Sequence, residues 1–342
     1  MSEDMDFEIL LAHLQRLVEQ SMPLWDQPEG TRATLMNVSE NATYRLDAPD
    51  GSKTVLRVHR ENYHSYNGIQ TELDWLHALQ NDAGIITPQA ITGRDGKEIQ
   101  EGIVDGLPVP RQMVLFEFID GVEPSEDDDL IEPFRKLGEV SALLHLHAID
   151  WQRPAYFKRL VWDHEHVVGP NPNWGNWRDG PIHEPAHIAQ FEQLEKGMVE
   201  RLNRYGRGPE RFGLAHADLR LANLLLVGDS TRVIDFDDCG DAWFLYDLAT
   251  ALTLIDNIEA TRALVESWLD GYARHRELDG DDLTAIASLI MMRRIAMMAW
   301  FGTHADTTLA QDHRGPFPAE TCEMIEAYLS SEPSADNIIP WA

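Results

Sequence analysis

Apolar and polar positions follow two different periods along the chain, and the change between them divides it. Near the N-terminus the apolar residues have helical spacing, which predicts an amphipathic helix. These residues are Phe7, Leu10, Leu11, Leu14, Leu17 and Val18. Residues 33–39, 41–48 and 53–60 then alternate with a period of two, which predicts three strands. The turn-forming residues 49–52 (Pro-Asp-Gly-Ser) join the last two strands as a hairpin.

One helix and further strands complete the first third of the chain. Residues 69–80 have helical spacing and predict a helix. Residues 89–106 read as a hairpin around Arg94-Asp95-Gly96, and residues 111–121 read as a strand. This part of the sequence therefore predicts a small antiparallel sheet with one inserted helix.

From about Glu123 the spacing of apolar residues becomes helical. Helices are predicted at 134–149, 188–205, 246–255, 260–275, 282–305 and 319–331. A hairpin-like pair of strands is predicted at 221–227 and 231–236. The pattern favours an α+β protein with two lobes, a small antiparallel β-sheet lobe with one helix and a larger, mainly α-helical lobe.

These elements predict a domain organisation in chain order. We expect an N-terminal helix in residues 1–28, a small β-rich lobe in 29–120 and a large helical lobe in 121–342. The strand around 115–121 is expected to link the two lobes.

Charge and cysteine content limit the classes of partner. The formal net charge of the 342-residue chain is −30, so there is no basic surplus for nucleic acid or for an anionic membrane surface. The acidity fits either a solvated surface or an acidic cleft for a cationic substrate. Cys239 and Cys322 form no disulfide framework and have no metal-ligand spacing. With no secretory leader and no run fit to span a bilayer, we expect a cytoplasmic protein; its oligomeric state is not predicted.

The apolar segment 214–226 carries polar residues at a spacing that suits phosphoryl transfer. Asp218 follows His216 by two residues, Asn223 follows Asp218 by five, and Asp235 ends a later apolar strand. Phosphoryl transfer needs one carboxylate to orient the attacking hydroxyl and hard oxygen ligands to hold Mg²⁺ against the nucleotide phosphates. The alternative is a capped loop between two elements with no chemistry.

The pattern H-x-D-x-x-x-x-N, followed by a strand and I-D, resembles the catalytic signature of protein-kinase-like phosphotransferases. Ala217 stands where eukaryotic protein kinases usually carry Arg, and this variant resembles the aminoglycoside phosphotransferase and choline kinase family. Within it, the sequence is most similar to the branch of homoserine-kinase-type enzymes and stress-response kinases. The segments SENATYRL, VLRVHR, LFEFIDG, LGEVSALLHLHA, IDFDDCG and YDLA follow the order of that family.

The resemblance implies a protein-kinase-like two-lobe fold and a role for each motif residue. It makes Asp218 the catalytic carboxylate and Asn223 and Asp235 the ligands of Mg²⁺, with ATP as the phosphate donor. His216 belongs to the same catalytic motif; a structural bond to backbone near the metal-binding strand is the favoured role, and direct catalysis is the alternative. Asp247 is interpreted as a carboxylate that anchors a helix.

The small lobe departs from the family at one position. Arg57 stands where kinase-like enzymes carry a lysine on the third strand, and Glu72 is its natural partner on the next helix. Arginine can bind phosphate bidentately, whereas lysine acts as a point charge. The alternative is an ion pair that only stabilises the lobe.

Two further segments of the small lobe are candidates for nucleotide contacts. No G-x-G-x-x-G is present; Ser39 and Asn41 lie in the turn that takes its place and could contact phosphates, although an ordinary hairpin turn explains them as well. The resemblance implies that adenine hydrogen-bonds to the backbone of Glu117 and Ile119.

The function that these residues predict is transfer of the γ-phosphate of ATP to a hydroxyl of a small molecule. Only eleven residues separate Asp235 from Asp247, too few for the activation segment on which a protein kinase docks a peptide. A bacterial serine/threonine protein kinase of the stress-response type and a catalytically weak nucleotide-binding module remain as alternatives. The acceptor could be an amino alcohol such as homoserine or choline, a sugar, or an aminoglycoside.

Overall fold

The computed structural model describes residues 6–331, 334–335 and 337–342. The chain forms two compact units. The first comprises Met1–Ala78, Thr87–Asp120 and Arg153–Lys158, and the second comprises Leu79–Ile86, Gly121–Gln152 and Arg159–Ala342. The N-terminal helix belongs to the same unit as the sheet that follows it.

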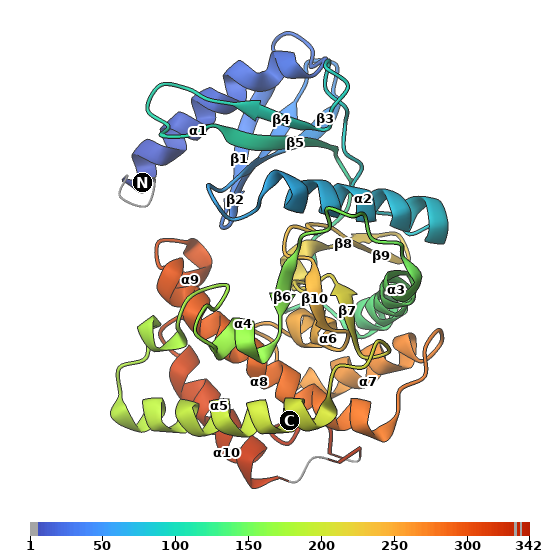
Figure 1. The fold of residues 1–342 in the computed structure, drawn as a ribbon, viewed down its shortest axis with the longest axis vertical. Helices are drawn as coiled ribbons and strands as arrows, with labels where there is room; N and C mark the ends of the chain where they lie inside the picture. Colours follow the sequence, from blue (N-terminus) through green and yellow to red (C-terminus); the bar gives the residue numbers. More distant parts are fainter. Residues whose placement is uncertain (1–5, 332–333, 336) are drawn as a thin grey trace. The chain divides into compact units, whose positions relative to one another are not determined.

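The first unit is built on a five-stranded antiparallel sheet with the strand order β1-β2-β3-β5-β4. Its strands are β1 (Arg32–Val38), β2 (Asn41–Asp47), β3 (Lys53–His59), β4 (Ile99–Gly102) and β5 (Arg111–Glu117). Helix α1 (Phe7–Ser21) lies against this sheet, as Figure 1 shows, and η1 (Met22–Leu24) follows it. The apolar face of α1 supplies Leu14, Leu17 and Val18 to the core of the unit.

Most of the strands predicted for the small lobe are present, but the predicted hairpin at 89–106 is wrong in its first half. The turn itself forms, because the N–H of Gly93 donates to the carbonyl of Lys97 (2.8 Å). The residues before it lie against β5 instead of pairing with β4: Ile91 donates to Leu115 (2.7 Å) and Ala90 bridges Phe116. The strand predicted at 111–121 ends at Glu117, so the linker beyond it is not a strand.

Helix α2 (Tyr66–Ala83) follows β3, and the second unit is mainly helical. The longer helices are α3 (Ile131–Asp150), α5 (Pro185–Tyr205), α7 (Thr261–Tyr272), α8 (Gly280–Thr303) and α10 (Phe317–Ser330). The shorter ones are α4 (His164–Val168), η2 (Trp177–Asp179), η3 (Leu221–Asn223), α6 (Tyr246–Ala251) and α9 (Thr308–His313).

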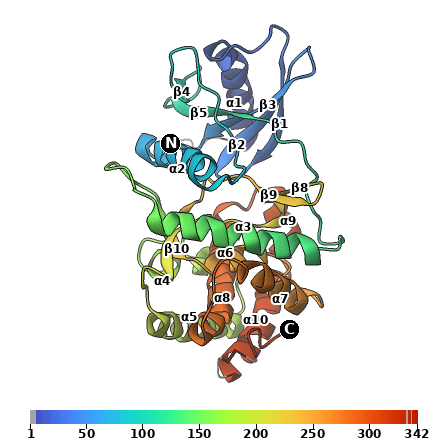
Figure 2. The same ribbon diagram turned by 90° about the vertical axis from the view of Figure 1, so that its right-hand side faces the viewer.

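Helices α3 and α7 lie side by side in the second unit, as Figure 2 shows. Their backbones approach closely at two glycines. A Cβ on Gly138 would lie 2.0 Å from the carbonyl oxygen of Trp268, and one on Gly271 would lie 1.8 Å from that of Arg135. Because neither backbone can give way, both positions require glycine.

Short strands in the second unit frame the candidate catalytic loop. Strands β6 (Leu160–Trp162), β10 (Gly240–Trp243) and β7 (Phe212–Ala215) form one sheet in that order, and β8 (Leu224–Val227) pairs with β9 (Ser230–Val233). The β8–β9 pair confirms the predicted hairpin. The three-stranded sheet was not predicted, because strands of three and four residues are too short to show a period of two.

Helix α8 corrects the expectation that no segment is fit to span a membrane. Among the described residues it is the one helix long and apolar enough to cross a bilayer. However, 89% of its apolar stretch is buried inside the protein. It also carries Arg293 and Arg294, both buried in ion pairs. These features are those of a helix packed in the core of the protein.

Candidate active site

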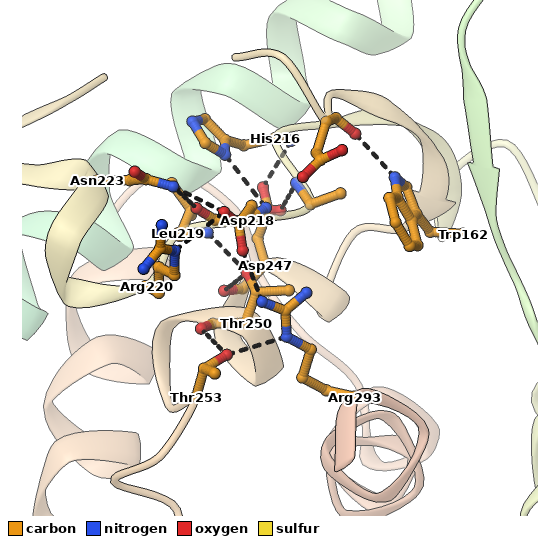
Figure 3. A network of polar contacts seen from close by, with 12 residues as sticks. Trp162, His216, Asp218, Leu219, Arg220, Asn223, Asp247, Thr250, Thr253 and Arg293 are labelled. Atoms are coloured by element: carbon orange, nitrogen blue, oxygen red, sulfur yellow. Dashed lines mark hydrogen bonds and ion pairs between the residues drawn. The ribbon is translucent and has the colours of Figure 1, made fainter. Parts of the chain in front are cut away.

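The candidate catalytic loop runs from the end of β7 to the start of β8, within the second unit. The amide nitrogen of Asn223 donates to Oδ2 of Asp218 and to the Asp218 carbonyl, each at 2.8 Å (Figure 3). Both side chains belong to residues that are at most 9% exposed. Because the nitrogen of the Asn223 amide is engaged by Asp218, its oxygen is the atom left to face a metal ion.

Helix α6 fixes the backbone of this loop. One carboxylate oxygen of Asp247 accepts the N–H of Ala217 (2.7 Å), and the other accepts the N–H of His216 (3.2 Å). The Thr250 hydroxyl accepts the N–H of Leu219 (2.9 Å). Residues three apart lie on the same side of a helix, so one face of α6 holds three donors of the loop. Asp247, a residue of helix α6, thus anchors the catalytic loop.

Asp247 is itself supported by a histidine for which the sequence indicated no role. His145 of α3 is fully buried; its Nε2 contacts Asp247 (2.8 Å) and its Nδ1 contacts the Tyr272 hydroxyl (2.9 Å). Burial lowers the pKa of His145, although Asp247 opposes that shift. A neutral imidazole that donates from Nε2 and accepts at Nδ1 satisfies both contacts.

The strand end that carries Asp235 is tied to the loop through the preceding residue. The N–H of Ile234 donates to the carbonyl of Asn223 (2.9 Å), and the carbonyl of Ile234 lies 3.1 Å from Nε2 of His216. Nδ1 of His216 accepts the N–H of Asp218 (3.2 Å), which places the proton on Nε2. His216 therefore makes the backbone contact that was predicted for it in a structural role.

Asp235 follows directly, with a φ of 60° and an exposed side chain. Aspartate tolerates this left-handed conformation better than most residues. The amide oxygen of Asn223 and the carboxylate of Asp235 are hard oxygen donors, and such donors suit Mg²⁺ or Ca²⁺. The residues present therefore fit a divalent metal of that class.

The electrostatics of Asp218 depend on two arginines. Burial alone would raise its pKa, but Arg293, Arg220 and His216 outweigh that effect and hold the pKa of Asp218 below its usual range. Nη2 of Arg293 lies 2.6 Å from Oδ1, and Nε of Arg220 lies 3.3 Å from Oδ2. Arg293 was missed in the sequence; its one signal is a pair of arginines inside the apolar run of α8.

In the first unit, the expected contact between Arg57 and Glu72 is present. Nη2 of Arg57 on β3 lies 2.8 and 2.7 Å from the two carboxylate oxygens of Glu72 on α2. The two side chains are 5% and 1% exposed. The ring of Phe116 lies 5.0 Å from the guanidinium carbon. Contact of Arg57 with nucleotide phosphates stays a prediction.

The other nucleotide candidates lie at turns and strand ends of the first unit. Ser39 donates its N–H to the carbonyl of Asn41 (3.1 Å), and the side-chain oxygen of Asn41 accepts the N–H of Arg60 (3.2 Å). The N–H of Glu117 donates to another backbone carbonyl (2.9 Å), so a contact of Glu117 with adenine would use its carbonyl oxygen. Ile119 lies beyond the end of β5 and is partly buried.

Similarity to known proteins extends over most of the chain. The model of the "Phosphotransferase enzyme family" matches residues 35–287. A solved aminopropanol kinase, described as microcompartment-associated, is 36% identical, covers 95% of this chain and 99% of its own, and has a TM-score of 0.85. Amicoumacin kinase of Bacillus subtilis (strain 168) is 24% identical over 75% of this chain and 76% of its own length.

More distant structures share the fold. A structure of an amicoumacin kinase in complex with AMP-PNP, Ca²⁺ and Ami is 21% identical, with a TM-score of 0.76 over 93% of this chain and 96% of that chain. A spectinomycin phosphotransferase is 14% identical, with a TM-score of 0.60 over 95% and 97%. The predictions of a protein-kinase-like fold and of a kinase-type transferase are confirmed, and the chain belongs to the phosphotransferase enzyme family.

Proposed function

We propose that this protein transfers the γ-phosphate of ATP, with Mg²⁺, to the hydroxyl of a small amino alcohol. The observation that carries the proposal is the geometry of Asp218 and Asn223. Their side chains are hydrogen-bonded at 2.8 Å, and the carboxylate remains ionised beside two arginines. Such a carboxylate can accept a hydrogen bond from a hydroxyl while the Asn223 oxygen faces a cation.

Each candidate residue then has a defined task. Asp218 orients the acceptor hydroxyl and accepts its proton as the phosphoryl group moves. Asn223 and Asp235 would hold Mg²⁺, which neutralises charge on the phosphate oxygens when it is bound. Arg57, kept in place by Glu72, supplies a guanidinium for the nucleotide phosphates.

The acceptor class is supported by the relatives. The aminopropanol kinase shares 36% identity with nearly the whole chain, and the net charge of −30 suits a cationic substrate. Amino alcohols carry the hydroxyl that Asp218 requires and an ammonium group that an acidic protein attracts. A sugar and an aminoglycoside are the alternative acceptors, and they are compared with the amino alcohols in the test below.

The protein-kinase alternative is disfavoured by the segment on the C-terminal side of Asp235. That segment enters β10 within a few residues, and its backbone is held by two side chains at β6. Arg159, which precedes β6, donates to the carbonyl of Cys239 (2.6 Å), and Trp162 of β6 donates to that of Asp238 (2.8 Å). Nearly all residues from 236 to 245 are buried, and the structure describes every one of them. This leaves no extended loop there on which a peptide could dock.

The test is a phosphorylation screen with ATP and Mg²⁺. The acceptors are 1-amino-2-propanol, homoserine, choline, ribose and kanamycin, with casein as a generic protein, and products are identified by mass spectrometry. We expect transfer to at least one amino alcohol and none to casein. Asp218→Asn is the control, and its kcat should fall about 10²–10⁴-fold. Transfer to casein alone, or turnover unchanged in Asp218→Asn, would contradict the proposal.

A further inference from the structure

The guanidinium of Arg293 is fixed from several sides inside the second unit. Its Nη2 donates to Oδ1 of Asp218 (2.6 Å), and its Nε donates to the hydroxyl oxygen of Thr253 (3.0 Å). The ring of Trp174 lies against it, with 5.0 Å between the guanidinium carbon and the ring centroid. The side chain is 3% exposed. Since a guanidinium is planar, fixing its Nε and one face also fixes the direction of Nη2.

Thr253 connects this arginine to the helix that anchors the catalytic loop. Its hydroxyl donates to the carbonyl of Thr250 (2.6 Å), and the Thr250 hydroxyl accepts the N–H of Leu219 (2.9 Å). Asp247, Thr250 and Thr253 follow one another at three-residue intervals, and Figure 3 shows the contacts they make. Thr250 and Thr253 therefore support both the backbone of the catalytic loop and Arg293, which contacts the Asp218 carboxylate.

The next residue on α8 provides a comparison within the same helix. Arg294 is also buried, at 2% exposed, and is also ion-paired: its Nη1 lies 2.5 Å from Oδ1 of Asp256. Its Nε donates to the hydroxyl of Thr321 (2.9 Å). Neither partner belongs to the catalytic loop. Both arginines are buried and ion-paired, but only Arg293 contacts Asp218.

We propose that Arg293 is a positioning residue for phosphoryl transfer, which acts through Asp218 by fixing the plane of its carboxylate. The inference rests on the proposed function and deepens it. Asn223 and Arg220 donate to Oδ2, while Arg293 donates to Oδ1, so the carboxylate is held at both oxygens. Each carboxylate oxygen accepts two hydrogen bonds, so a position for the acceptor hydroxyl remains.

Without Arg293, the carboxylate would keep its donors on one oxygen alone and could rotate about its last bond. A displacement of about 1 Å at a reacting group can cost about 10²-fold in rate. The loss is expected in kcat, because the substitution leaves Arg57, Asn223 and Asp235, the residues proposed for the nucleotide and the metal, in the protein.

The experiment compares Arg293→Met, Arg293→Lys, Thr253→Val and Arg294→Lys with the native protein. ATP, Mg²⁺ and the best acceptor of the screen are the assay components, and melting temperature is measured on the same samples. We expect Arg293→Met to lower kcat about 10²-fold with the KM for ATP nearly unchanged. Arg293→Lys should recover part of kcat. Thr253→Val, which has nearly the native shape, should lower kcat by a smaller factor, and it serves if Arg293→Met does not fold.

Arg294→Lys is the matched control: it should lower the melting temperature and leave kcat unchanged. Native kcat in Arg293→Met and Thr253→Val would overturn the proposal. A raised KM for the acceptor with native kcat would also overturn it, because Arg293 would then bind substrate directly.

A second measurement separates this inference from the proposed function. If the native protein phosphorylates no acceptor, the proposed function fails. The interaction between Asp218 and Arg293 is then tested by the melting temperatures of Asp218→Asn, Arg293→Met and the double variant. Non-additive shifts support a coupled pair, and additive shifts overturn the positioning role whatever the substrate is.

Discussion

Ala217 has a φ of 64°, and its N–H is held at 2.7 Å by the carboxylate of Asp247. A left-handed conformation costs an alanine about 1–2 kcal/mol. The residue is nevertheless fully buried, and the backbone N–H of each neighbour from His216 to Leu219 is hydrogen-bonded as well. The strain lies between the two candidate chemistry-bearing residues of the motif, His216 and Asp218, where the turn of the chain sets the direction of the Asp218 side chain.

The cost of this strain can be measured with Ala217→Gly. Glycine relieves the left-handed penalty, but it loses a buried methyl worth about 0.8 kcal/mol and gains about 0.5–1 kcal/mol of unfolded-state entropy. The free energy of unfolding in urea should therefore change by less than about 1 kcal/mol. Ala215→Gly is the matched control, because Ala215 is equally buried and has no positive φ. Equal losses in the two variants would show that the left-handed conformation carries no penalty.

His145 should make stability depend on pH. Its pKa is lowered in the folded protein, mainly by burial and despite Asp247, with Tyr272 and Arg276 also facing it. Folding favours the neutral form of His145. The contribution of His145 to stability is therefore complete above its unfolded pKa of about 6.5, and it is lost as the pH falls through and below that value.

We expect the free energy of unfolding to fall below pH 6.5 more steeply in the native protein than in His145→Gln. The difference in slope can reach about 1.4 kcal/mol per pH unit. Urea titrations at several pH values between 5 and 8 measure it. Identical slopes in the two proteins would mean that His145 is not held neutral.

How much the sequence could predict depends on how close in the chain the interacting residues are. Asp218 and Asn223 are five residues apart, so their spacing alone indicated a shared site. Arg57 and Glu72 are fifteen apart, on a strand and the helix that follows it, and the resemblance to kinase-like enzymes indicated that pair. Local periods were enough to predict the strand and the helix that carry them.

The residues that were missed contact the site from far along the chain. Arg293 lies 75 residues from Asp218, and His145 lies 102 residues from Asp247. In the sequence, each looks like a polar residue within an apolar helix. Only the packing of α8 and α3 around the loop shows which carboxylate they meet, and no local pattern encodes that packing.

Substitutions of Arg57 can distinguish two roles of its ion pair with Glu72. If the guanidinium contacts nucleotide phosphates, Arg57→Ala should raise the KM for ATP and lower kcat together, because one contact both binds and aligns. Arg57→Lys should recover much of the activity, although the fork of contacts with Glu72 is lost. If the pair only stabilises the first unit, both variants should lower the melting temperature and leave the KM for ATP nearly unchanged. ATP kinetics and melting curves on the same two proteins decide between these outcomes.

Asp235 offers the most direct test of the metal assignment. Asp235→Asn keeps the shape of the side chain and tolerates the positive φ, but it removes the negative charge from the donor set. Loss of an outer-shell partner alone costs about 10–100-fold in metal affinity, so the Mg²⁺ concentration for half-maximal activity should rise at least about tenfold.

Binding of Mn²⁺ in the presence of AMP-PNP, followed by electron paramagnetic resonance, gives a readout that needs no turnover. Asp229→Asn is the matched control, since Asp229 is an exposed aspartate at the turn of the β8–β9 hairpin. Asp229→Asn should change neither the Mg²⁺ dependence of activity nor the binding of Mn²⁺, because a surface carboxylate outside the loop contributes little to the proposed site of Asn223 and Asp235. Should Asp235→Asn bind Mn²⁺ like the native protein, the ligand role would pass to another carboxylate, and the I-D motif would have only a structural part in the loop.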